Sequence, residues 1–180
     1  MAEAALLEDL PRIAEQRVAP GDLDAHLANA REPFVVRGLA ADWPLVRAAR
    51  EGDASVRDYL VRHARDRAFP VNIGEPGAGD RFFYNAAMGM NFRMAQGPLG
   101  PVLDGILANA DKPDAPAIYL SSIDMDGYFD GLAEANRLPL GERRPIESIW
   151  IGNRTRIAAH NDVPENIAVC AVGRRRFTLF

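Results

Sequence analysis

Hydrophobic residues in the first part of the chain recur three and four positions apart, which places them on one face of a helix. Residues 98–110 show this spacing most clearly. Asp22 and Ser55 are suitable N-cap residues for two earlier helices, and Asp42-Trp43-Pro44 opens a further one. The predicted helices are 22–30, a segment from 44, a segment from 55, 98–110 and 128–136.

Shorter hydrophobic runs bounded by turn residues predict β-strands, and they become dense toward the C-terminus. Gly173 and Arg174 form a tight turn between the last two runs, because glycine accepts a positive φ. Helices followed by closely spaced strands predict a fold that is mainly β with N-terminal helices, built as a sandwich or barrel. The predicted strands are 34–36, 69–73, 81–84, 91–94, 117–121, 146–151, 155–159, 166–172 and 175–180.

Composition predicts an ordinary globular protein. The chain has 180 residues, of which 48% are hydrophobic and 26% charged, enough for one domain with a core. No apolar stretch approaches the roughly 18 residues of a membrane span. The acidic start MAEAALLEDLPR lacks the basic region of a signal peptide, and the single cysteine, Cys170, cannot form an internal disulfide. We therefore predict a cytoplasmic protein with no membrane partner.

Charge argues against nucleic acid as the main partner. The formal net charge is −4, and the only dense basic run is Arg174-Arg175-Arg176. Arginine is far more frequent than lysine, of which Lys112 is the single example, and the chain has 13 prolines. This bias is typical of a bacterial genome rich in G and C.

The strongest candidate for chemistry is the tripeptide His160-Asn161-Asp162. Residues i and i+2 of an extended strand point to the same side, so His160 and Asp162 present an imidazole nitrogen and a carboxylate oxygen together. These are two of the three ligands in the facial triad that holds Fe(II). The pattern also occurs by chance, and the alternative is an exposed histidine beside a strand-end aspartate.

The last predicted strand adds a cation. Alternation places Arg175 on the same face as Phe177 and Leu179. If that face is interior, the guanidinium needs an anion, which a bound carboxylate would supply through two hydrogen bonds. The alternative is a rim residue whose charge reaches solvent.

The segment 148–180, SIWIGNRTRIAAHNDVPENIAVCAVGRRRFTLF, resembles the cupin-like JmjC family of Fe(II)- and 2-oxoglutarate-dependent oxygenases. It is similar in particular to the asparaginyl hydroxylase that acts on hypoxia-inducible factor. The segment 32–46, EPFVVRGLAADWPLV, is similar to the family's opening strand and following turn. The resemblance implies one domain over 1–180, a double-stranded β-helix (cupin jelly-roll) barrel. Its helical portion would cover about 1–115 and its first barrel strands about 116–180.

The resemblance also implies roles for single residues. His160 and Asp162 fall on the metal-binding pair, as catalytic ligands of Fe(II). Arg175 and Tyr119 fall where the family grips the distal carboxylate of the co-substrate 2-oxoglutarate. Asn166 matches an asparagine that lines the co-substrate pocket.

Two positions depart from the family pattern. Thr155 lies two residues before the usual co-substrate threonine, and Ile157 occupies that position. Either Thr155 substitutes in binding the co-substrate or the contact is lost. Asn161 stands where an aromatic residue is common, a change expected to affect contacts with the substrate rather than the metal.

The family's third iron ligand is a histidine on a later strand, and no histidine follows His160 here. His26 and His63 lie on predicted helices, where an amphipathic or surface role is expected. We therefore expect an N-terminal portion of a longer enzyme, with the distal part of the barrel missing. Water or a small molecule in the third position is the alternative.

The leading functional hypothesis is an Fe(II)/2-oxoglutarate dioxygenase of hydroxylase or demethylase type, with O₂ as oxidant. Its primary substrate, a protein side chain or a small molecule, is unknown, and related enzymes often form homodimers. The alternative is a non-catalytic cupin-like binding module or a degenerate enzyme. A cupin isomerase or sugar-binding protein would call for more His or Glu near the strand.

Large apolar residues outside these motifs are interpreted as packing residues. Trp43 and Trp150 are expected in the core or at its rim. Met88, Met90 and Met94 are interpreted as gap-filling core residues, with a substrate channel as the alternative.

Overall fold

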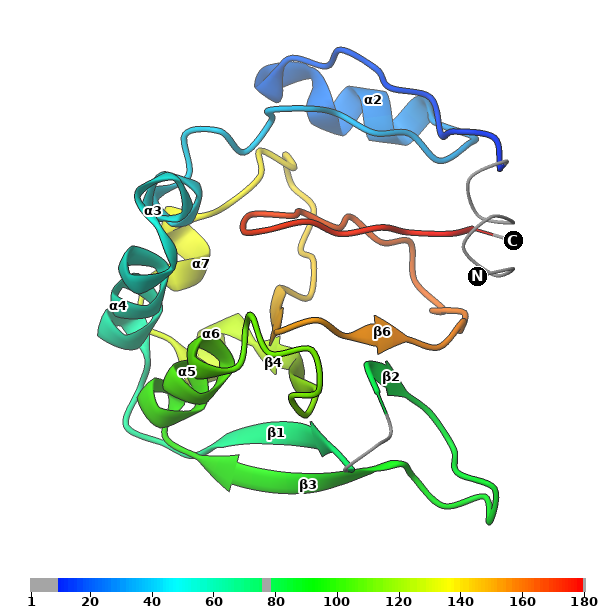
Figure 1. Cartoon of the computed structure of the whole chain (residues 1–180). Helices are drawn as coiled ribbons and strands as arrows, with labels where there is room; N and C mark the ends of the chain where they lie inside the picture. Colours follow the sequence, from blue (N-terminus) through cyan, green and yellow to red (C-terminus); the bar gives the residue numbers. More distant parts are fainter. Residues whose placement is uncertain (1–9, 76–78, 180) are drawn as a thin grey trace. The chain divides into compact units, whose positions relative to one another are not determined.

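The computed structural model describes residues 10–75 and 79–179, which fall into two compact units (Figure 1). The smaller unit consists of the described residues up to Asp42 together with Leu138–Arg144. The larger unit consists of Trp43–Arg137 and the described residues from Pro145 onward. Most of the acidic N-terminal segment and Phe180, the last residue of a predicted strand, lie outside the described residues.

The smaller unit contains the short 3-10 helix η1 (Pro20–Asp22) and helix α2 (Leu23–Asn29), which confirms the predicted helix over 22–30. Leu23 is the buried residue of α2. The predicted strand 34–36 is reduced to one parallel bridge between Glu15 and Val35.

Three predicted helices of the larger unit are confirmed: α3 (Pro44–Glu51), α4 (Asp53–His63) and α5 (Leu99–Ala108). Helix α4 begins two residues before the predicted cap, Ser55. The single helix predicted over 128–136 is wrong. The chain forms two short helices instead, α6 (Met125–Tyr128) and α7 (Leu132–Ala135). Gly131 stands before α7 with φ of 67°, a left-handed conformation that a right-handed helix cannot continue through.

Four strands form an antiparallel sheet in the order β3-β1-β4-β5. A second, two-stranded sheet pairs β2 with β6 in parallel. A register shift between Leu120 and Ile123 interrupts the β4–β5 ladder, and Ser122 there has φ of 50°. The strands are β1 (Phe69–Gly74), β2 (Arg81–Phe82), β3 (Phe92–Gly97), β4 (Ile118–Asp124), β5 (Ser148–Gly152) and β6 (Arg156–Ile157).

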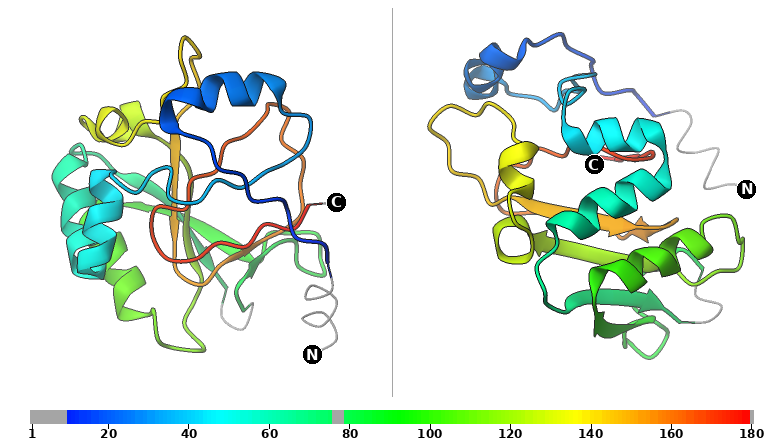
Figure 2. Two further views of the ribbon diagram at one scale, coloured as in Figure 1. Left: turned by 90° about the horizontal axis from the view of Figure 1, so that it is seen from above. Right: turned by 90° about the vertical axis from the view of Figure 1, so that its left-hand side faces the viewer.

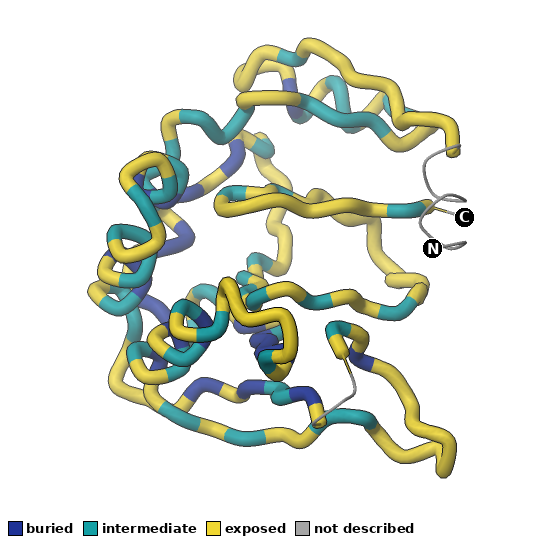
Figure 3. The backbone as a smooth tube through the Cα atoms, in the orientation of Figure 1, coloured by how far each residue is buried: buried dark blue, intermediate teal, exposed yellow. Residues whose placement is uncertain are grey.

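The main core lies between helices α3, α4 and α5 and one face of the four-stranded sheet (Figure 2). Alternate residues of the central strands point into it, among them Phe69 of β1 and Leu120 of β4. The other parity of β4 contributes to a smaller cluster, which contains Tyr119, Phe82 and Phe92. Figure 3 shows the buried positions concentrated in the helices and central strands. The sheet therefore has a helix-covered face and an aromatic face.

Residues 158–179 contain no helix or strand, so the predicted strands 166–172 and 175–180 are wrong over their described part (Figure 1). A strand needs a neighbour that completes its hydrogen bonds, and no described strand pairs with either segment. Gly173 nevertheless has the positive φ, 70°, expected of the turn. The described strands do not form a closed barrel. Within the described ranges, no helix is long and apolar enough to cross a membrane.

Candidate functional site

Tyr119 occupies the centre of the aromatic face. It lies on β4, opposite Asn72 of β1 and Gly152 of β5. Its ring centroid lies 5.7 Å from that of Phe82 and 6.0 Å from that of Trp150. The residue is only 5% exposed, and among the described residues its buried hydroxyl makes no hydrogen bond of ordinary geometry. A buried hydroxyl without a partner is costly, so this oxygen is a candidate ligand contact.

Gly152 explains why Tyr119 can lie so close to the neighbouring strand. A Cβ atom at this glycine would stand 2.9 Å from the carbonyl oxygen of Ile118 and 3.0 Å from Cδ2 of Tyr119. Both distances are too short for ordinary carbon contacts. The tyrosine ring therefore occupies space that the side chain of any other residue at position 152 would fill. The strand pair is thus shaped around Tyr119.

Arg175 brings a positive charge to this hydroxyl. Burial raises the pKa of Tyr119 above its ordinary value, whereas Arg175 acts in the opposite direction, through its charge and through weak hydrogen bonding to the hydroxyl. The guanidinium carbon lies 5.8 Å from the Trp150 ring centroid and 5.5 Å from that of Phe177. A cation next to a buried, unpartnered hydroxyl is an arrangement suited to an anion such as a carboxylate.

Arg175 itself is exposed, so the interior position predicted for it by strand alternation is wrong. Phe177 and Leu179 are 58% and 55% exposed, so the face they share with Arg175 is not interior in the described structure. This segment pairs with no described strand, so its side chains need not alternate between an interior and an exterior face. Their exposure depends on the irregular path of the backbone instead. The guanidinium nevertheless lies close enough to Tyr119 to act on the pKa of its hydroxyl.

His160 and Asp162 lie together in the irregular segment that follows β6. The distance from His160 Nε2 to Asp162 Oδ1 is 3.8 Å, and both side chains are about half exposed. His160 Nδ1 lies 2.8 Å from the carbonyl oxygen of Ala158. Since a carbonyl only accepts, this bond puts a proton on Nδ1 and leaves Nε2 of the neutral ring as a free donor atom for a metal. A backbone carbonyl on the distal ring nitrogen is typical of metal-binding histidines.

Asn166 and Thr155, the other predicted co-substrate residues, have different surroundings. The Asn166 amide donates to Asp162 Oδ2 over 2.7 Å, so it orients the carboxylate. Thr155 is half-buried and lies beside Gly152, next to the Tyr119 region. Ile157 belongs to β6 and pairs with Phe82. The co-substrate roles of Asn166 and Thr155 stay predictions.

The donor set fits part of an Fe(II) site. An imidazole nitrogen and a carboxylate oxygen are suitable ligands for non-haem Fe(II), and they stand side by side. Across residues 10–75 and 79–179, no group of three His, Cys, Asp or Glu side chains could hold a metal ion together. The described residues therefore offer two of the three donors that such a triad would need.

Sequence reasoning missed the relation of Trp150 to this site, because it treated the indole as packing only. Trp150 shares the face of β5 that carries Ser148 and Gly152, and it is 37% exposed. The period of two along the strand was the available signal. The core interpretation of the methionines is also wrong: Met88, Met90 and Met94 are 76%, 51% and 83% exposed, because their loop and edge strand lie outside both hydrophobic clusters.

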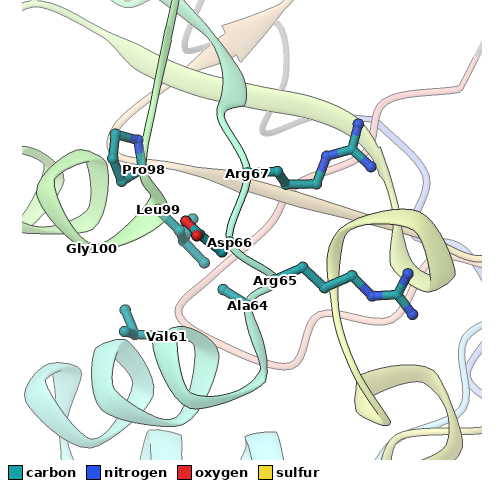
Figure 4. A pocket seen from close by; sticks show the side chains of 8 residues that line it. All are labelled: Val61, Ala64, Arg65, Asp66, Arg67, Pro98, Leu99 and Gly100. Atoms are coloured by element: carbon teal, nitrogen blue, oxygen red, sulfur yellow. The ribbon is translucent and has the colours of Figure 1, made fainter.

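A separate pocket of about 280 Å³ lies between the end of α4 and the start of α5 (Figure 4). Two arginines that line the pocket already bind other residues of the chain. Arg65 pairs with Asp130 at 2.8 Å, and Arg67 donates to the Gly127 carbonyl at 2.7 Å while stacking on Tyr128. The pocket contains none of the predicted site residues.

Comparison with known families agrees with this architecture. A family model for the cupin-like domain matches residues 20–180, which is most of the chain. A search of curated proteins found no match to the chain. The chain belongs to the cupin-like domain family, and the fold class predicted from the sequence is confirmed.

Proposed function

We propose that this member of the cupin-like domain family is an Fe(II)- and 2-oxoglutarate-dependent oxygenase of hydroxylase or demethylase type. The observation that carries the proposal is the buried, unpartnered hydroxyl of Tyr119 beside the guanidinium of Arg175. A hydroxyl donor and a guanidinium together match one carboxylate, such as the distal carboxylate of 2-oxoglutarate. The adjacent donor atoms of His160 and Asp162 support the same proposal.

In this proposal the chain's own residues bind and orient. His160 Nε2 and the Asp162 carboxylate would hold iron, while the Ala158 carbonyl and the Asn166 amide keep both side chains in place. Arg175 and Tyr119 would bind the far end of 2-oxoglutarate, which directs its 2-oxo acid end away from them. Iron bound with 2-oxoglutarate supplies activation of O₂ for attack on a C–H bond.

We propose that a third iron ligand comes from outside the described residues or from a small molecule. Thr155 is proposed as an additional co-substrate contact. The primary substrate is proposed to be a protein side chain or a small molecule, acted on by a cytoplasmic, bacterial enzyme able to form a homodimer.

The first test is calorimetric titration of 2-oxoglutarate into the full chain without oxygen, with and without Fe(II). We expect binding that Fe(II) strengthens. Arg175→Gln should lose binding, whereas the neighbouring control Arg174→Gln should keep it. His160→Ala and Asp162→Asn should remove only the Fe(II)-dependent part, with Glu165→Gln as the matched control for the carboxylate. Absence of any 2-oxoglutarate binding would overturn the proposal.

The second candidate function is a metal-free binding module. It is favoured by the fact that the Tyr119–Arg175 pair needs no metal to attract a carboxylate. In that case 2-oxoglutarate or another dicarboxylate binds equally with and without Fe(II), and His160→Ala changes nothing. Formation of succinate from 2-oxoglutarate in the presence of Fe(II) and O₂ would exclude this second function.

A further inference from the structure

Arg175 is held near Tyr119 by aromatic rings rather than by an acidic partner. Its guanidinium carbon lies within about 6 Å of two ring centroids, the range of favourable cation–π contact. Among residues 10–75 and 79–179, no carboxylate forms an ion pair with Arg175. The charge is therefore oriented but not neutralised.

The two rings differ in what they can provide. Phe177 lies on the same irregular segment as Arg175 and is 58% exposed, so it provides no link from the arginine to a strand. Trp150 lies on β5, a strand of the four-stranded sheet, and its indole N–H donates to Ser148 Oγ over 3.1 Å. Trp150 also packs against Tyr119, at 6.0 Å between ring centroids. Of the two rings, only that of Trp150 connects Arg175 to the sheet that carries Tyr119.

We propose that Trp150 is a positioning residue for carboxylate binding: its ring holds the Arg175 guanidinium toward the Tyr119 hydroxyl, so that both groups bind one carboxylate. The inference rests on the proposed function, because it assumes that this carboxylate belongs to 2-oxoglutarate. A flat guanidinium can stack on an indole and still direct N–H groups at a ligand, which a lysine ammonium cannot do in the same way. The arrangement therefore selects arginine at this position.

The test uses the fact that the chain has two tryptophans, Trp43 and Trp150. In a Trp43→Phe background, Trp150 is the only indole, and its fluorescence reports on the site while calorimetry measures affinity independently. Titration with 2-oxoglutarate should change the Trp150 emission with the same Kd that calorimetry gives. The change should persist in Arg174→Gln and disappear in Arg175→Gln.

Two substitutions separate the π face from simple bulk, each with circular dichroism melting as a check of folding. Trp150→Leu keeps a smaller, apolar side chain without a π face and should weaken 2-oxoglutarate binding about 3- to 10-fold. Trp150→Phe keeps a smaller π face and should recover part of that loss. Equal affinities of the wild type, Trp150→Phe and Trp150→Leu would overturn the positioning role while leaving the proposed function intact.

A double-mutant cycle with Arg175→Lys distinguishes positioning from general packing. If Trp150 acts through the guanidinium, Trp150→Leu should cost clearly less in the Arg175→Lys background than in the wild type. An equal fold-loss in both backgrounds would show that Trp150 only supports the fold, and would overturn the inference. Failure of the wild type itself to bind 2-oxoglutarate would instead overturn the proposed function, together with the inference that rests on it.

Discussion

The two faces of the four-stranded sheet differ in whether their buried side chains have all the partners they need. On the helix-covered face, Phe69 and Leu120 are both 0% exposed and pack among other apolar side chains. On the aromatic face, the neighbouring residue of the same strand, Tyr119, buries a hydroxyl that has no described partner. One face thus contributes stability, and the other retains an unmet polar group that a ligand would satisfy. A strand with alternating faces allows both within adjacent residues.

The largest effect is expected on the helix-covered face. Leu120→Ala should lower the free energy of unfolding by about 2–5 kcal/mol, because it leaves a cavity in a fully buried site. Chemical denaturation with urea measures the loss. The control is Ile146→Ala, at a residue 91% exposed, which should change stability by less than about 0.5 kcal/mol. Equal losses in the two variants would contradict the assignment of the main core.

Gly152→Ala should affect both stability and ligand binding. The added methyl group would contact the Ile118 carbonyl and the Tyr119 ring, which forces the tyrosine to shift. We expect a loss of about 1–3 kcal/mol, typical of overpacking, together with weaker 2-oxoglutarate binding. Gly97→Ala is the matched strand control, because its new Cβ would meet only Val102 at an ordinary 3.8 Å. A Gly152→Ala protein with normal affinity would show that the position of Tyr119 is not critical.

Tyr119→Phe sharpens the comparison because its two effects have opposite signs. Removing the unpartnered hydroxyl should stabilise the fold by about 1 kcal/mol, while 2-oxoglutarate binding weakens. The control is another buried tyrosine, Tyr59, whose hydroxyl accepts a hydrogen bond from Asn136 at 2.9 Å. Tyr59→Phe should instead destabilise by about 1 kcal/mol. Destabilisation by both substitutions would mean that the Tyr119 hydroxyl has a partner in solution.

The same hydroxyl predicts a dependence on alkaline pH. Burial raises the pKa of Tyr119 in the folded chain, so folding favours the neutral hydroxyl. This contribution is fully present below the ordinary tyrosine pKa of about 10 and is lost as the pH rises through the higher folded value. Between about pH 9 and 11, the wild type should therefore lose more unfolding free energy than Tyr119→Phe. Parallel denaturation curves of the two proteins across this range would refute the prediction.

The smallest effect is expected at the surface of the helical layer. Arg57 of α4 pairs with Asp104 of α5 at 2.9 Å, and this contact lowers the pKa of Asp104. The stabilisation is present above the ordinary aspartate pKa and is lost as the pH falls through the lower folded value. Asp104→Asn should slightly reduce stability at neutral pH and flatten its decline in acid. Thermal melting at several pH values and salt concentrations measures this, since added salt should shrink the difference.

Local patterns predicted the helices well, with one instructive exception. Residues 98–110 and 22–30 become α5 and α2 because helical hydrogen bonds join residues four apart, which a short sequence window contains. The helix predicted over 128–136 is interrupted at Gly131, whose positive φ depends on how the chain turns there. Periodicity alone could not distinguish one helix from two short ones.

The C-terminal segment shows the opposite limit. The pattern of 166–172 and 175–180 is typical of strands, but the described part forms none, because a strand exists only when a neighbour completes its ladder. The exposure of Met88 and Met94 is a similar case, since composition does not say which surfaces become covered.

The sequence by itself determined the candidate chemistry: the spacing of His160 and Asp162, the arginine at 175, the apolar faces of the helices and, by resemblance, the pairing of Arg175 with Tyr119. Only the tertiary structure decided that Tyr119 buries an unpartnered hydroxyl and that Trp150 lies over Arg175. The physical reason is distance along the chain. Residues 119 and 150 lie on different strands and residue 175 lies in the irregular C-terminal segment, so their contacts depend on sheet pairing and packing that no local window contains.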